Sequence, residues 1–150
     1  MATLCTAGFA EMDAATLYAL LRLRVDVFVV EQQCPYPELD GRDTEPSTVH
    51  LWLEQTGAPV AYLRILREQD GRARIGRVAV AKDARGGGNA GRLMDAALAV
   101  VGERECVLDA QSHLVEFYTR YGFTPAGDEF DEDGIPHVPM YRPPLPTAGW

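Results

Sequence analysis

The densest chemical signal in the sequence is a glycine-rich stretch, Arg85–Arg92, with three consecutive glycines and an arginine at each end. Glycine lets backbone N–H groups approach a ligand without a Cβ atom in the way. Apolar residues recur at helical spacing from Leu93 to Val101, so the stretch opens a helix whose first N–H groups are unpaired. Because an apolar strand ending at Val80 precedes it, the order strand, glycine loop, helix favours a bound phosphate group.

Two common nucleotide motifs fit this loop poorly. Gly86, Gly88 and Gly91 match the dinucleotide pattern GxGxxG, but five residues, 81–85, separate them from the preceding strand. In a Rossmann unit the first glycine follows the strand almost directly. A Walker loop requires GKS or GKT, and neither occurs in this sequence. Both classes of nucleotide site are therefore disfavoured.

The elements that must position the loop follow from the spacing of apolar residues. Strands are expected at 3–10, 49–53, 60–66, 73–80 and 106–110, and helices at 14–33 (one or two, capped by Asp13), 93–101 and 112–121. Residues 34–47 are expected to form a polar loop, 123–130 and 136–142 a terminal hairpin, and the tail 143–150 no regular structure. A meander followed by a strand–helix–strand crossover indicates a mixed α/β layer fold.

Composition narrows the class of protein. A chain of 150 residues that is 47% hydrophobic and 24% charged fits one domain, residues 1–150. A net charge of -8 argues against general nucleic-acid binding and suits a cationic or amine substrate. No apolar run is long enough to span a membrane, and the N-terminus lacks the features of a signal peptide, so a cytoplasmic protein is expected.

Other polar clusters are predicted to be structural. Cys5, Cys34 and Cys106 are widely separated, so free thiols and no metal site are expected. The acidic clusters at 40–43 and 131–133 have the composition to attract a cation, but such residues are more typical of turns.

Two motifs in this order carry a family resemblance. Arg85-x-x-Gly88-x-Ala90, after a Val78–Val80 strand, and the run Phe117–Phe123, which reads FYxxxGF, resemble the pyrophosphate loop and the later helix of the GCN5-related N-acetyltransferase (GNAT) family. The runs 24–36 and 132–137 are similar to the ElaA subfamily, so the resemblance covers nearly the whole chain.

The resemblance implies a fold and a cosubstrate. The fold is an α/β (mixed α+β) GNAT domain: a mostly antiparallel sheet of six to seven strands, splayed between strands 4 and 5 and flanked by about four helices. The cosubstrate is acetyl-CoA, with no metal. The residues expected to bind it are Val78, Ala79, Val80, Arg85, Gly86, Gly87, Gly88, Asn89, Ala90, Gly91, Arg92 and Gln111, the last standing where many relatives carry an asparagine.

The implied reaction is direct attack of an amine on the acetyl thioester in a ternary complex. Tyr118 matches the tyrosine usually assigned as general acid, and a backbone N–H of residues 78–80 is a candidate oxyanion donor. Because the attacking amine must be neutral, a general base is expected. Glu31, His50 and His137 are candidates, although a solvated helix end, a satisfied strand histidine and a water relay stay open as alternatives.

Two other functions remain open at this stage. A non-catalytic module that senses acyl-CoA would keep the same cradle, and an acyl-homoserine-lactone synthase-like acyltransferase is suggested by Arg24, Phe28 and Glu31. The explicit glycine loop favours acetyl-CoA. The acceptor is expected to be an amine of a small molecule or peptide, and the sequence does not distinguish a monomer from a homodimer.

Overall fold

A computed structural model describes residues 2–145. The strands are β1 (Thr3–Ala7), β2 (Val49–Gln55), β3 (Ala58–Arg67), β4 (Ala73–Val80), β5 (Cys106–Gln111), β6 (Thr124–Pro125), β7 (Phe130–Glu132) and β8 (Ile135–Arg142). The α-helices are α1 (Ala14–Val25), α2 (Asn89–Val101) and α3 (Val115–Thr119), and a π-helix, η2 (Asp26–Glu31), continues α1. Short 3₁₀ turns are η1 (Phe9–Glu11), η3 (Arg42–Thr44), η4 (Lys82–Ala84) and η5 (Ser112–Leu114). Of the predicted irregular tail, residues 146–150 lie outside the described part.

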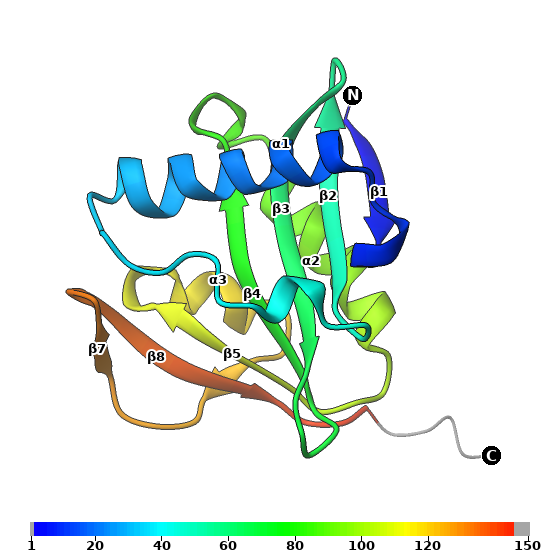
Figure 1. Cartoon of the computed structure of the whole chain (residues 1–150). Helices are drawn as coiled ribbons and strands as arrows, with labels where there is room; N and C mark the ends of the chain where they lie inside the picture. The colour runs from blue at the N-terminus through cyan, green and yellow to red at the C-terminus, as the bar shows by residue number, and fades with distance from the viewer. Residues whose placement is uncertain (1, 146–150) are drawn as a thin grey trace.

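The sheet opens between its fourth and fifth strands. Its order is β1-β2-β3-β4-β5-β8-β6, with β7 added on β8, and all neighbours are antiparallel except β4 and β5. These two parallel strands pair only at Ala73↔Cys106 and Arg74↔Val107. Beyond that point they diverge (Figure 1). The predicted fold class and the predicted splay are therefore confirmed, with eight strands in the described residues where six to seven were expected.

Helices cover both faces of the sheet (Figure 1). On one face α2 and α3 bury Leu93, Met94 and Tyr118 against β2, β3, β4, β5 and β8. On the other face α1 packs Leu20 and Leu23 against Trp52, Tyr62 and Ala79. Burial of large apolar side chains stabilises such layers by roughly 1.5–3 kcal/mol each. The two cores hold β4 rigidly on one side of the opening.

Local sequence signals set the helix ends. The Asp13 side chain accepts a hydrogen bond from the backbone N–H of Thr16, which caps α1 as predicted. Gly88, with φ of +82°, precedes α2, and Gly102, with φ of +65°, ends it. The π-helix after α1 is a departure from the predicted helix at 14–33, and such turns occur frequently at functional sites.

Strand β4 carries an irregularity next to the opening. Its register with β3 shifts between Tyr62 and Arg64, so that β4 holds an extra residue. Arg77 lies at this bulge with φ of +54°, a left-handed conformation that is uncommon for a residue other than glycine. A bulge takes backbone groups out of the ladder, and this one lies on the strand that borders the gap between β4 and β5.

The predicted hairpin of 123–130 and 136–142 is wrong in its first strand. The structure splits that segment into β6, which pairs with β8 at Tyr141 and Met140, and β7, which pairs with β8 at residues 135–137. Proline lacks the N–H that a continuous ladder needs, and Pro125 and Pro139 both lie where the ladder breaks.

Candidate active site

A groove of about 630 Å³ lies in the opening between β4 and β5. On the β4 side it is lined by the glycine loop before α2, and on the β5 side by Glu132, Asp133 and His137 of the β7–β8 hairpin. Ile75 and Leu108 line it near the point where the two strands meet. The groove therefore lies between the predicted phosphate cradle and the β7–β8 hairpin.

The glycine loop has the backbone of an open cradle. Gly86 and Gly88 adopt φ of +81° and +82°, and a Cβ atom built at either position would meet nothing within 4 Å. Of the predicted binding residues here, Arg85, Gly86, Gly88, Asn89, Ala90 and Gly91 line the groove. The Asn89 side chain donates to the carbonyl oxygen of Ala84, which closes the loop on itself.

Three predicted cosubstrate residues, Ala79, Gly87 and Arg92, do not line the groove. Ala79 packs into the core beneath α1, because alternation along β4 turns it away from its groove-lining neighbours Val78 and Val80. Gly87 is not among the lining residues. Arg92 points elsewhere, since its Nη1 donates to the carbonyl oxygen of Ala2.

Arg85 is held by two partners. Its Nε donates to the carbonyl oxygen of Val80 at 3.0 Å, and Nη1 and Nη2 donate to the two carboxylate oxygens of Glu31 at 2.6 and 2.7 Å. This pairing lowers the pKa of Glu31 below its usual value. The carboxylate therefore stays ionised and hydrogen-bonded, which makes Glu31 a weak base.

The residues after Glu31 contact two more sides of the groove. Gln32 and Gln111 exchange amide hydrogen bonds at 3.4 and 3.3 Å, which joins the end of η2 to the end of β5. The Cys34 thiol donates to the carbonyl oxygen of Asp133 in the β7–β8 turn. The segment 31–34 therefore contacts Arg85, Gln111 and Asp133 around the groove, and Gln111, a predicted cosubstrate residue, lines the groove.

Tyr118 reaches the groove from α3. The side chain is 6% exposed, and its ring packs edge-on against Phe117 and Phe123. Burial raises the pKa of Tyr118 to about 12. Within residues 2–145 its hydroxyl makes no hydrogen bond. A protonated phenol therefore lines the groove with its donor available.

His50 does not reach the groove. It is 1% exposed, and its Nε2 donates to the carbonyl oxygen of Asp43 at 3.0 Å while its Nδ1 accepts from the hydroxyl of Tyr62 at 2.6 Å. Burial lowers the pKa of His50, so the ring is neutral. Alternation along β2 correctly indicated its face, but α1 and the 34–47 loop cover that face. As a candidate base, His50 is corrected to a residue of the buried polar network.

His137 lines the groove from β8, opposite Gln111 in the β5–β8 ladder. Its Nδ1 donates to the carbonyl oxygen of Ile135 at 2.8 Å, and the ring stacks on Phe130. Because Nδ1 carries the proton in this contact, Nε2 holds the lone pair. Nε2 lies 3.9 Å from a carboxylate oxygen of Glu132. The structure therefore leaves one ring nitrogen of His137 able to accept a proton.

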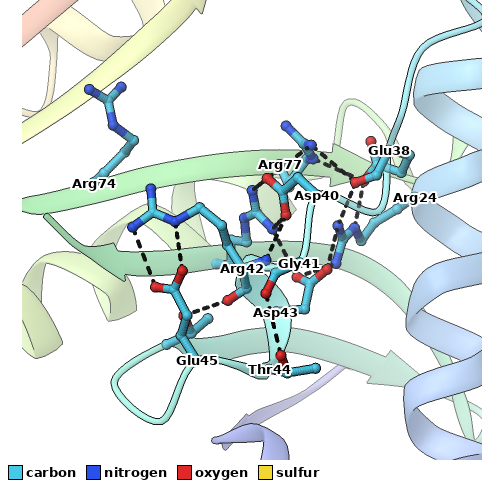
Figure 2. A network of polar contacts seen from close by, with 12 residues as sticks. Arg24, Glu38, Asp40, Gly41, Arg42, Asp43, Thr44, Glu45, Arg74 and Arg77 are labelled. Carbon is cyan, nitrogen blue, oxygen red and sulfur yellow. Dashed lines mark hydrogen bonds and ion pairs between the residues drawn. The ribbon is translucent and has the colours of Figure 1, made fainter.

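A buried ionic network borders the groove (Figure 2). Arg24 of α1, 1% exposed, donates to Glu38 and Asp43 at 2.7 Å each. Arg64 of β3 donates to Asp40 and Asp43, and Arg77 of the β4 bulge donates to Glu38 at 3.0 Å. The acidic cluster at 40–43, predicted to be turn residues, thus binds arginines of the sheet.

Sequence reasoning missed several groove residues. Tyr36, Arg74, Gly76, Arg77 and Asp109 all line the groove. A glycine inside a strand suggests a β-bulge or the close approach of another group to the backbone. Gly76 could therefore have indicated from the sequence that β4 is irregular here. The positions of the others depend on the splay and on the loop at 34–47.

Comparison with known proteins gives the family. The acetyltransferase (GNAT) domain matches residues 17–142 of the sequence. The chain belongs to this GNAT acetyltransferase family. Within residues 2–145 no helix is long and apolar enough to cross a membrane. In the same part of this GNAT chain, no group of three or more His, Cys, Asp or Glu side chains is placed to hold a metal ion.

Similar proteins show which group of GNAT proteins this chain resembles. A UPF0039 protein of Mycobacterium tuberculosis is 54% identical over 89% of this chain and 88% of its own length. Protein ElaA of Escherichia coli is 41% identical over 88% of this chain and 90% of its own length. The crystal structure of an acyl-CoA N-acyltransferase from Pseudomonas aeruginosa has a TM-score of 0.91 at 40% identity, covering 95% of this chain and 99% of that one. The chain is therefore an ElaA-like GNAT protein, which supports N-acyl transfer as its activity.

Proposed function

We propose that the chain is a single acetyltransferase domain that transfers an acetyl group from acetyl-CoA to an amine by direct attack in a ternary complex. The observation that carries the proposal is the glycine cradle at the start of α2, which opens onto the gap beside the β4 bulge. Backbone amides of residues 86–91 would bind the diphosphate. Val78 and Val80 would line the path of the pantetheine arm.

Arg85 and Gln111 complete the proposed acetyl-CoA site. Arg85 is preorganised by Glu31 and by the carbonyl oxygen of Val80, so its charge is fixed beside the loop. The space at the Cβ positions of Gly86 and Gly88 is open, which fits close approach of a phosphate to the backbone. Gln111 would contact the arm from the opposite strand.

In the proposed reaction the amine nitrogen forms a bond to the acetyl carbon while the carbon–sulfur bond breaks. His137 Nε2 would accept the proton lost by the amine, and Tyr118 would donate a proton to the departing thiolate. Glu31 is less suited to the base role, because its carboxylate is held by Arg85. A backbone N–H near the bulge would stabilise the developing oxyanion.

Calorimetric titration with acetyl-CoA, followed by a thiol-release assay with a panel of amines, tests the proposal. We expect binding, and amine-dependent release of CoA that Tyr118→Phe reduces. Binding without turnover of any amine would indicate a sensing module. Preference for an acyl-carrier protein over acetyl-CoA would indicate a lactone-synthase-like enzyme. No binding of acetyl-CoA would refute the proposal outright.

A further inference from the structure

The floor of the groove on the α1 side is a glycine. Gly76 lines the groove in the middle of β4, directly beside the bulge at Arg77, and pairs across the ladder with Arg64. A Cβ atom built on Gly76 would meet nothing within 4 Å. A glycine inside a strand costs stability, and one frequent reason for it is the close approach of a ligand. The space above Gly76 is therefore available to a bound group.

Two arginines flank this space from the same strand. Arg74 and Arg77 both line the groove, with side chains 30% and 21% exposed. Arg74 uses Nε for Glu68 and Nη1 for Asp109, while Arg77 uses Nε and Nη2 for Glu38 and Asp40. Within residues 2–145, Nη2 of Arg74 and Nη1 of Arg77 have no hydrogen-bond partner and are not buried. Each guanidinium thus retains donors that the protein does not use.

The carboxylates that hold these arginines lie mostly behind them. Glu38, Asp40 and Glu68 do not line the groove, whereas Arg74 and Arg77 do. The fourth carboxylate, Asp109, lines the groove beside Arg74. Figure 2 shows Glu38 and Asp40 on the side of Arg77 that faces the 34–47 loop, with Arg74 farther along the same strand. Carboxylates in this position fix the direction of a guanidinium, and they leave its outer edge to bind an oxyanion.

We propose that Arg74, Gly76 and Arg77 form a subsite for a carboxylate of the acceptor, so that the acceptor is an amine that also carries a carboxylate, such as a free amino acid. This inference rests on the proposed acetyl transfer. Gly76 directly precedes Arg77 of the bulge, and successive residues of a strand are about 3.3 Å apart, so a carboxylate above Gly76 would lie close to the thioester carbonyl that the bulge is proposed to bind. That spacing suits an amine and a carboxylate on one small molecule better than the two ends of a long polyamine.

Acidic residues on the β7–β8 side of the groove fit the ammonium group of a zwitterionic acceptor. Glu132 and Asp133 line the mouth beside His137, where the structure offers a proton acceptor for the amine. The acidic mouth and a net charge of -8 would attract the ammonium group, while the inner arginines take the carboxylate. A simple polycation would place positive charge against Arg74 and Arg77.

The first test compares matched acceptors. The twenty amino acids and their carboxamides, which keep the amine and lose the negative charge, are assayed for CoA release with acetyl-CoA. We expect at least one acid to react with kcat/KM at least tenfold above that of its amide. Acetyl-CoA titration is run in parallel: without binding, the proposed acetyl transfer itself fails. If acetyl-CoA binds and no acid exceeds its amide, the carboxylate subsite alone is overturned, including the case in which no acid reacts.

The second test uses variants that should fold. Gly76→Val fills the open floor with a side chain that favours strands, and Arg74→Gln removes one guanidinium. Gly76→Val should raise KM for the acid and for its amide alike, because the two have nearly the same shape. Arg74→Gln should raise KM for the acid at least tenfold and leave KM for the amide within about twofold. Both variants should keep the Kd of acetyl-CoA within about twofold and keep the melting temperature. Arg72→Gln is the matched control, since Arg72 forms an exposed pair with Asp70 outside the groove. Equal loss for acid and amide in Arg74→Gln, no loss for the acid in Arg74→Gln, or no loss in Gly76→Val would contradict the subsite.

Discussion

The proposed role of Tyr118 as general acid depends on a single hydroxyl group. Its raised pKa, about 12, keeps the phenol protonated up to pH 10, so kcat should not fall between pH 8 and 10 through its ionisation. General acids contribute about 10²- to 10⁴-fold, and because this phenol is a weak acid we expect Tyr118→Phe to lower kcat by about 10²-fold. KM for acetyl-CoA should not change. The measurement is kcat across pH 7–10 for both proteins.

Tyr141→Phe provides the control for that experiment, because Tyr141 lies on β8 and does not line the groove. The Tyr141→Phe variant should acetylate the acceptor amine with the kcat of the native protein. If Tyr118→Phe also retains full activity, Tyr118 is only a core aromatic residue.

Glu31 distinguishes a base from a positioning residue. Its two hydrogen bonds to Arg85 are partly exposed, and such pairs contribute about 1 kcal/mol or less, so Glu31→Gln should weaken acetyl-CoA binding by at most about fivefold. Because the pairing lowers the pKa of Glu31, its charge is constant at neutral pH and kcat should change little. Calorimetry and a pH series of turnover rates check both points. If Glu31→Gln instead slows turnover by two orders of magnitude or more, Glu31 is the base, whereas we expect His137→Gln to cause the large loss.

At the scale of the element, the start of α2 depends on a left-handed backbone. Gly88 has φ of +82°, and a left-handed conformation costs another residue about 1–2 kcal/mol. Gly88→Ala should therefore distort the cradle and raise the Kd of acetyl-CoA about 5- to 30-fold. Gly87→Ala is the matched control, since neither position has a neighbour within 4 Å and only Gly88 has a positive φ. Calorimetric titration of both variants is the measurement, and equal affinities would mean that the backbone conformation at residue 88 does not matter.

The predictable elements were those defined by local signals. Asp13 marked the start of α1, Gly102 the end of α2, and alternation along β2 and β4 identified the strands. The break between β6 and β7 was missed because it depends on Pro125 pairing with β8 next to Pro139, which is fixed by register and not by either strand alone. Likewise the bulge at Arg77 appears only when β3 and β4 are paired.

The site residues divide in the same way. The glycine loop is contiguous in sequence, so its composition identified it. The partners of Arg85 and Gln111 could not be predicted, because Glu31 and Gln32 reach them from η2 across 54 and 79 residues of chain. Arg24 lies within the apolar face of a predicted helix. A charged residue in that position is a sequence signal for a buried ion pair.

At the scale of the whole molecule, the buried ionic network joins α1, the 34–47 loop and strands β2 to β4. The cations of this network are arginines, whose planar guanidinium binds carboxylates through several hydrogen bonds at once. Asp43 accepts from Arg24 and Arg64, and its backbone carbonyl accepts from His50. One loop therefore ties the helix layer to the sheet next to the groove.

This arrangement predicts how stability depends on pH. Burial acts to raise the pKa of Asp43, but hydrogen bonds and charge from Arg24 and Arg64 outweigh it, so the pKa lies below its usual 3.8. Since the unfolded chain binds the proton more readily, Asp43 stabilises the fold above pH 4 and loses this contribution as the pH falls through its folded-state pKa. Asp43→Asn should therefore cost about 1–3 kcal/mol at pH 7, because Arg24 and Arg64 each lose one of their two carboxylate partners.

The difference in unfolding free energy between native protein and Asp43→Asn should narrow steadily from pH 5 to pH 2, because protonation removes from the native protein what the variant already lacks. Urea unfolding across that range measures it. Asp70→Asn, which breaks the exposed pair with Arg72, should destabilise the fold much less than Asp43→Asn at pH 7. A gap for Asp43→Asn that stays constant with pH would show that packing, and not the charge of this carboxylate, binds the loop to the sheet.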